Sequence, residues 1–166
     1  MDKPRALLGS ALFFLAAPGT IAGLAPWLIT HWRFQPGLEW TRFAGAVVIL
    51  AGLTPLLDSF ARFALQGGGT PAPIAPPERL VVTGFYRHVR NPMYVGVLAA
   101  IFGQALLFAN ANLVAWGAFI WLAFHVFVVF YEEPTLGVSF GSAYDRYCQH
   151  VPRWRPRLRP WRQTPE

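Results

Sequence analysis

The chain has 166 residues, of which 54% are hydrophobic, 16% are aromatic and only 13% are charged. A soluble domain carries about 25% charged residues, so this composition excludes a water-soluble globular domain, and it also excludes a disordered chain. Cys148 is the only cysteine, which excludes a disulfide scaffold, and a net charge of +6 in so apolar a chain indicates one face of a membrane rather than a nucleic-acid partner.

The first apolar stretch, residues 6–30, contains no charged side chain. At about 1.5 Å per residue it is long enough to cross about 30 Å of hydrocarbon. It is too long for the apolar region of a signal peptide, and further apolar stretches follow, so we expect a retained membrane span. Pro18, Gly19, Gly23 and Pro26 predict that this span is kinked or closely packed.

The later apolar stretches predict three more spans. Residues 43–57 are uncharged and reach a full span if Trp40 and residues 60–65 lie at the interfaces. Residues 66–77 contain three glycines and four prolines and predict a linker outside the bilayer. The uncharged run 91–131 has about twice the length of one span, so we expect two antiparallel spans that turn near residues 110–112.

These elements predict an all-α, polytopic integral membrane protein with about four transmembrane helices. We expect an N-terminal pair of helices over residues 1–65, a linker over 66–79, and a core over 80–166 that ends in a polar, basic tail. With the N-terminus inside, twelve of the 14 Lys and Arg residues lie on the cytoplasmic side, and only Arg33 and Arg42 lie outside. Both termini are therefore expected in the cytoplasm, with a bacterial inner membrane as the setting.

This topology gathers three polar segments on one face, namely residues 80–96, 131–134 and 140–156. Glu132 and Glu133 are expected to end the fourth span, opposite Arg87, His88 and Arg90, which precede the third. Adjacent carboxylates at a membrane boundary are unfavourable unless cations or water meet them, so they indicate a functional site. The alternative is an interfacial anchor in which these carboxylates pair with arginines.

An ordered set of residues in these segments resembles the isoprenylcysteine carboxyl methyltransferases, integral membrane enzymes that in turn resemble the phospholipid N-methyltransferases. The resemblance covers about the C-terminal half of the chain. Before the third span it rests on Leu80, Val81, Gly84, Tyr86, Arg90, Asn91, Pro92, Tyr94 and Gly96. After the fourth span it rests on Glu132, Glu133, Phe140, Gly141, Tyr144, Tyr147, Val151, Pro152 and Arg153.

The resemblance implies methyl transfer from S-adenosylmethionine to a lipid or apolar acceptor, with membrane lipids as partners and without a metal or nucleic acid. It places the cofactor between the last two spans and a capping tail. The glycine-rich motif of soluble nucleotide-binding folds is absent, since residues 67–69 follow no strand pattern. The cofactor-binding residues implied are Leu80, Val81, Tyr86, Asn91, Tyr94, Glu132, Tyr144 and Arg153, and Tyr147 is a further aromatic neighbour for the sulfonium.

The catalytic candidates are His88, Arg90 and Glu133. His88 is the histidine of the motif cluster that can act as a base near neutral pH, and its alternative is an interfacial cation beside lipid phosphate. Glu132 is expected to meet the cofactor's ammonium, and Glu133 either shares that task or binds Arg90. His125 lies in mid-span, where a buried helix-packing role is the commoner one, although a lone intramembrane histidine is also a candidate for function.

Two positions depart from the resemblance and bear on the acceptor. Asn91 stands where these enzymes commonly have histidine, and Val128 stands where the prenylcysteine enzymes place a substrate-binding arginine. A prenylcysteine carboxylate, a phospholipid amine and a thiol therefore all stay open as acceptors. Two other readings are a sterol-type membrane reductase that uses NADPH and a non-enzymatic membrane scaffold.

Overall fold

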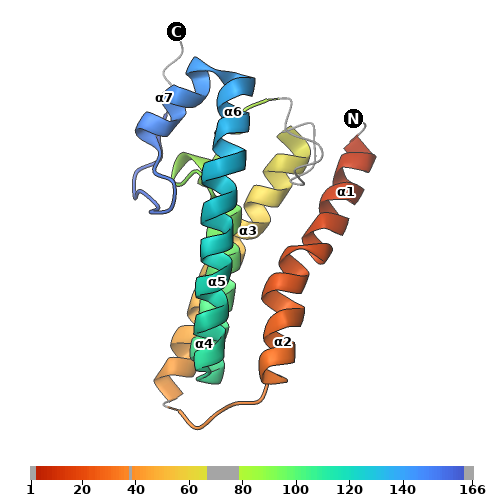
Figure 1. The fold of residues 1–166 in the computed structure, drawn as a ribbon, viewed down its shortest axis with the longest axis vertical. Coiled ribbons are helices and arrows are strands. Elements are labelled where there is room, and N and C mark those ends of the chain that lie inside the picture. Colours follow the sequence, from red (N-terminus) through yellow and green to blue (C-terminus); the bar gives the residue numbers. More distant parts are fainter. Residues whose placement is uncertain (1–2, 38, 67–78, 163–166) are drawn as a thin grey trace.

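The computed structural model describes residues 3–37, 39–66 and 79–162. Within these ranges every regular element is a helix and there is no β-strand, which confirms the expected all-α class. Residues 67–78, which form most of the predicted linker, lie outside the described residues. Figure 1 shows an N-terminal rod of α1 and α2 beside a bundle of α3, α4 and α5, with α6 and α7 at the end where α1 begins.

The N-terminal rod consists of α1 (Lys3–Ala16), the π-helical turn η1 (Thr20–Leu24) and α2 (Ala25–Thr30). Pro26 has no backbone N–H to donate to the carbonyl of Ala22, and the wide turn arises beside it. The carbonyls left free accept side-chain donors from the bundle. Gln104 Nε2 donates to Ala22 O at 2.7 Å and Trp116 Nε1 donates to Ile21 O at 3.0 Å, so the irregular backbone is satisfied inside the protein.

Two long helices, α3 (Glu39–Gln66) and α4 (Pro92–Phe108), pack along a seam of glycines. An added Cβ at Gly45 would lie 2.5 Å from Gly103 O, and one at Gly96 would lie 2.6 Å from Gly52 O. The pairs Gly45–Gly103 and Gly52–Gly96 show that the helices run antiparallel. In a bilayer, where lipid is as apolar as the side chains, this close backbone approach is what holds a helix pair together.

The predicted hairpin of the third and fourth spans is present. Ala109 ends α4 in the left-handed conformation, with φ of 50°, and the side chain of Asn110 accepts from Asn112 N at 2.9 Å to begin α5 (Ala111–Phe127). The helix does not end at Glu132 and Glu133. It widens into the π turn η3 (Val128–Glu132) and continues as α6 (Glu133–Phe140), because the wide turn accommodates Pro134.

Three segments in the described part of the chain are long and apolar enough to cross a membrane: Ala11–Thr30, Glu39–Arg62 and Ala111–Phe140. The remaining expected span, the third along the chain, is α4, which is shorter, with 17 residues. At 1.5 Å per residue α4 is about 25 Å long, which is shorter than the thickness of the hydrocarbon core, about 30 Å. Helix α4 lies between α3 and α5, and its buried Val97, Leu98 and Ile101 form a core cluster with residues of both neighbours.

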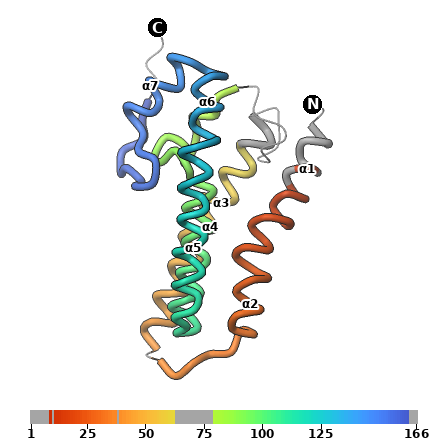
Figure 2. The backbone as a smooth tube through the Cα atoms, in the orientation of Figure 1, coloured from red at the N-terminus to blue at the C-terminus, as the bar shows by residue number. Residues whose placement is uncertain are grey.

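The tail folds back over the start of α4. After α7 (Ser142–His150) the chain returns beside the segment 79–91, which contains the short 3₁₀ helix η2 (Gly84–Arg87), and Figure 2 shows the two segments side by side. Backbone hydrogen bonds join them: Arg90 N donates to Pro152 O, and Arg157 N donates to His88 O, each at 2.9 Å. The structure therefore brings the three predicted polar segments together at one end of the bundle.

Candidate active site

The site centres on Tyr94 and Glu132, which come from different helices. Tyr94 lies in the first turn of α4, where Pro92 supplies a preformed helical φ at a position that needs no N–H. Glu132 is the last residue of the π turn η3. The Tyr94 hydroxyl donates to Glu132 Oε2 at 2.8 Å, and both side chains are half-buried.

Aromatic rings surround Tyr94. Its ring centroid lies 4.5 Å from that of Phe124 on α5 and 6.5 Å from that of Trp154 in the tail. Ring faces carry negative charge density and attract cations. This corner of the site, formed by Glu132 and the rings of Tyr94, Phe124 and Trp154, therefore combines one carboxylate with three rings. Such a combination suits a ligand that carries positive charge.

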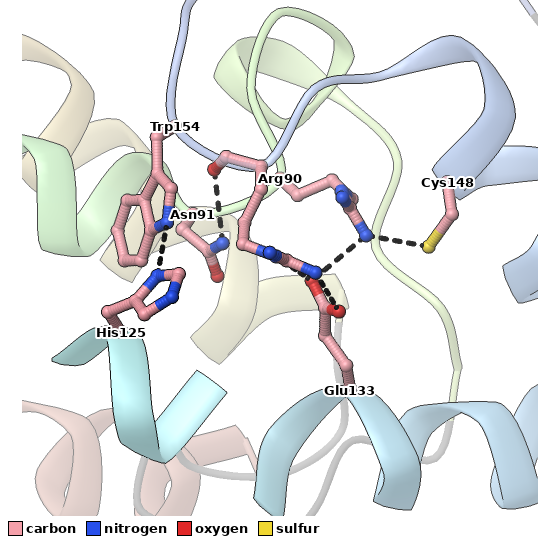
Figure 3. Close-up of polar contacts among 7 residues, drawn as sticks. Arg90, Asn91, His125, Glu133, Cys148 and Trp154 are labelled. Atoms are coloured by element: carbon pink, nitrogen blue, oxygen red, sulfur yellow. Dashed lines mark hydrogen bonds and ion pairs between the residues drawn. The ribbon is translucent and has the colours of Figure 1, made fainter. Parts of the chain in front are cut away.

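Glu133 has a different environment from its neighbour. Its Oε1 lies 2.9 Å from Arg90 Nη1 (Figure 3). Arg153 contacts both carboxylate oxygens, with Nε at 2.7 Å and Nη2 at 2.8 Å. The hydrogen bonds to Glu133 raise the pKa of Arg153 above its ordinary value. Glu133 therefore joins α6 both to the segment 79–91, through Arg90, and to the tail, through Arg153.

The two glutamates differ because successive residues on a helix point about 100° apart. Among the described residues, the ion pairs of Glu133 have no counterpart at Glu132, whose hydrogen bond comes from the neutral Tyr94. A carboxylate without a cation partner at a membrane boundary is costly unless a ligand or water meets it. Glu132 is thus the acid open to a cationic ligand, and Glu133 is already neutralised.

Arg90 and Asn91 fasten the tail to the beginning of α4. Arg90 Nη1 also contacts Cys148 Sγ at 2.9 Å, and Arg90 Nε is buried without a hydrogen-bond partner in the described part of the chain. Asn91 (labelled in Figure 3) is 6% exposed, and its Nδ2 donates to Arg153 O at 3.1 Å. The amide that stands in place of the common histidine therefore contacts the tail backbone.

The tail tyrosines lie in a small core at this end of the molecule. Tyr144, Tyr147 and Val151 are buried, and the expected cofactor residue Leu80 packs against them, while its neighbour Val81 is 8% exposed. Tyr147 OH donates to Tyr86 O at 2.7 Å. Burial raises the pKa of each of these tyrosines well above its ordinary value, so the phenols stay neutral donors.

Tyr86 and Tyr144 lie near different acids. The charge of Glu132 is a second cause that raises the pKa of Tyr86, whereas Tyr144 is affected by Cys148 and then by Glu133. The structure thus brings Tyr86, Tyr94 and Glu132 to one corner. Tyr144 lies instead near Glu133, and also near Arg90, whose charge lowers its pKa.

His88 faces the tail. Its Nδ1 lies 2.8 Å from Arg157 O, and because a carbonyl only accepts, Nδ1 carries the proton and Nε2 is the proton-accepting atom of the neutral ring. Its ring also lies 6.1 Å from that of Phe85. No contact within the described residues joins His88 to Tyr94 or Glu132, so its role as a base stays a prediction.

Sequence reasoning missed Trp154, which contacts both Tyr94 and His125. Trp154 Nε1 donates to His125 Nδ1 at 3.1 Å, across 29 positions of sequence (Figure 3). The one feature of the sequence that could have indicated Trp154 is its position directly after the motif residue Arg153. Val128, which stands at the position of the substrate arginine of the prenylcysteine enzymes, is an apolar side chain that is fully buried.

The sequence profile of the phospholipid methyltransferase family matches residues 40–143, which is more than half of the chain. No curated protein and no solved structure matched the chain. The match includes α3, the hairpin of α4 and α5, and both glutamates, and it ends before Arg153 and Trp154. The protein therefore belongs to the phospholipid methyltransferase family, which includes the isoprenylcysteine methyltransferase-like membrane enzymes. This membership points to a membrane methyltransferase and does not favour the reductase or the scaffold.

Proposed function

We propose that the protein transfers a methyl group from S-adenosylmethionine to an amine on a membrane lipid, in the corner formed by Tyr94, Glu132 and Trp154. The observation that carries this proposal is the contrast between the two adjacent glutamates: Glu133 is neutralised by two arginines, and Glu132 is held by a neutral phenol. A carboxylate that no arginine neutralises is the group that can hold the ammonium of S-adenosylmethionine.

The residues present suit the cofactor. Glu132 offers a carboxylate to the ammonium of the methionine part, a charge-assisted contact. The rings of Tyr94, Phe124 and Trp154 suit a sulfonium, because aromatic faces attract cations. Leu80, Val81 and Tyr86 are proposed to line the nucleoside side. When bound, S-adenosylmethionine supplies an activated methyl group, so the protein has mainly to align it and to exclude water.

The tail is proposed to exclude that water. Arg153 binds Glu133, Asn91 binds the tail backbone, and the ring of Trp154 lies 6.5 Å from that of Tyr94. These contacts hold the tail beside the first turn of α4 and the first residue of α6, where we propose that it closes the site. Holding reactants in one geometry in a closed site can supply about 7–11 kcal/mol of a barrier. In this account Arg90 and Glu133 act by holding the tail.

An amine acceptor fits better than a carboxylate. Val128 is apolar and fully buried, so the chain offers no arginine there to a substrate carboxylate. An amine must reach the site neutral or lose its proton before attack. His88 Nε2 is the proton-accepting atom we propose for this, since Nδ1 donates to Arg157 O.

A screen with labelled methyl donor tests the proposal. Purified protein in lipid nanodiscs receives phosphatidylethanolamine, a prenylcysteine or a long-chain thiol as acceptor. We expect label in the methylated amine lipid and little in the other two. Label in a methyl ester or thioether would refute the amine assignment, and failure of all acceptors together with no binding of S-adenosylhomocysteine would refute methyl transfer itself.

A further inference from the structure

His125 is the one described histidine whose ring hydrogen bond fixes Nδ1 as an acceptor. The donor is Trp154 Nε1, and an indole nitrogen only donates. In His88 and His150 the partner of Nδ1 is a carbonyl oxygen, so there Nδ1 is the donor. His125 is therefore a neutral imidazole with its proton on Nε2, the opposite tautomer.

The Nε2–H of His125 has no hydrogen-bond partner within the described part of the chain. His125 lies on α5 inside the candidate span Ala111–Phe140 and is half-buried. It stacks on Trp121, at 5.4 Å and 19°, and Trp121, Leu122 and Val126 are all more than two-fifths exposed on the outer side of α5. The imidazole thus lies at the border between the site and the bilayer, where an unsatisfied donor is costly.

The position of His125 relative to Glu132 matches the order of groups in a lipid. Seven residues separate them, about 10 Å along the helix at 1.5 Å per residue, with His125 deeper in the span. In a phospholipid, the amine lies outermost, and the phosphate and the ester groups follow toward the hydrocarbon. An amine beside Tyr94 and Glu132 therefore places a phosphoryl or ester oxygen at the depth of His125.

We propose that His125 Nε2–H donates to a phosphoryl or ester oxygen of the acceptor lipid, and that Trp154 fixes the tautomer that makes this possible. The inference rests on the proposed function, since it names the part of the acceptor that the protein recognises. His125 then selects lipids that carry oxygen at this depth. Trp154 is a positioning residue, because it acts through His125.

Nitrogen-15 NMR of histidine-labelled protein tests the tautomer and the contact without turnover. The pair of imidazole nitrogen resonances that disappears in the His125→Gln variant is assigned to His125. We expect an unprotonated Nδ1 and a protonated Nε2, with Nε2 shifting when phosphatidylethanolamine enters the nanodisc. A protonated Nδ1, or an Nε2 that inorganic phosphate shifts as much as the lipid does, would overturn the proposal.

Kinetics separate recognition from packing. His125→Leu should raise KM for phosphatidylethanolamine about three- to tenfold, the worth of one hydrogen bond, and leave KM for a long-chain alkylamine unchanged. His125→Gln, whose amide both accepts and donates, should restore most of the loss. Trp116→Phe, which removes an indole hydrogen bond elsewhere on α5, is the matched control and should change neither KM.

Calorimetry with S-adenosylhomocysteine keeps the two proposals distinguishable. We expect all these variants to bind it as the wild type does. Absence of binding by the wild type would count against the proposed function, whereas the NMR response to lipid would still test His125. A His125→Leu variant that raises KM equally for both acceptors, or that loses cofactor binding, would show a structural role and overturn the inference.

Discussion

Replacement of Glu133 by Gln tests whether this acid holds the tail in place. The amide keeps the shape of the side chain but removes the charge that two guanidinium groups share, at 2.9 Å from Arg90 and 2.7 Å from Arg153. Arg90 is then left with its charged side chain only 13% exposed and without an anionic partner among the described residues. Arg153 is 32% exposed, so water offsets part of its loss.

Loss of one partner of a buried pair costs about 3–5 kcal/mol, and the partial exposure lowers the expected cost here to about 2–3 kcal/mol. For a chain of this length that is a fall in Tm of about 4–12 °C. Thermal unfolding in detergent, followed by tryptophan fluorescence, measures it, because Trp154 and Trp161 report on the tail. Glu39→Gln, at the exposed start of α3, is the matched control. Equal Tm values for the two variants would refute the assignment of Glu133 to the tail.

Three further predictions concern the scaffold. Gly96→Ala places a Cβ against Gly52 O and should lower the free energy of unfolding by about 1–3 kcal/mol, measured by thermal unfolding. An added Cβ at Gly137 meets nothing within 4 Å, so Gly137→Ala, the control, should not destabilise the protein. Equal effects of the two substitutions would contradict the close packing of α3 and α4. Burial raises the pKa of Tyr147, so its contribution to stability is present below the unfolded value of about 10 and is lost as pH rises beyond it. Tyr147→Phe should therefore reduce the fall in Tm between pH 9 and 11, and an unchanged slope would refute this. The third prediction tests the topology with both termini in the cytoplasm, by single cysteines in a Cys148→Ser background. Leu158→Cys should react with a membrane-impermeant maleimide only in opened membranes, whereas Phe34→Cys should react in intact cells. The reverse result would invert the topology.

The sequence was enough to predict the helical architecture and the meeting of the polar segments. Uncharged length predicted the spans, and Asn110 marked the turn of the hairpin, because these signals are local. The π turn at η3 was not predictable, since it depends on how Pro134 fits against the preceding turn. The glycine seam of α3 and α4 had a visible signal, because each helix has two glycines seven residues apart, but the partner helix is fixed only by the fold.

The sequence predicted which residues lie in the candidate site better than it predicted what each residue contacts there. The motif residues Arg90, Tyr94, Glu132, Glu133 and Arg153 do meet, since a hairpin and a returning tail bring them to one end. Which glutamate meets the arginines depends on the rotation of one helical turn, which composition and spacing do not determine. The tail contacts His88 in the segment 79–91 and His125 on α5. Because the tail has no regular structure, no periodic pattern in the sequence predicts these contacts.

Binding of S-adenosylhomocysteine by purified wild type and Glu132→Gln, measured by calorimetry, tests the central claim most directly. The carboxylate of Glu132 is the acid left open to an ammonium, and a hydrogen bond to a charged group contributes about 1.5–3 kcal/mol. Glu132→Gln should therefore weaken binding about 10- to 100-fold, while Glu39→Gln binds like the wild type. Equal affinity of Glu132→Gln and wild type, or no binding by the wild type in both detergent and lipid, would contradict the account.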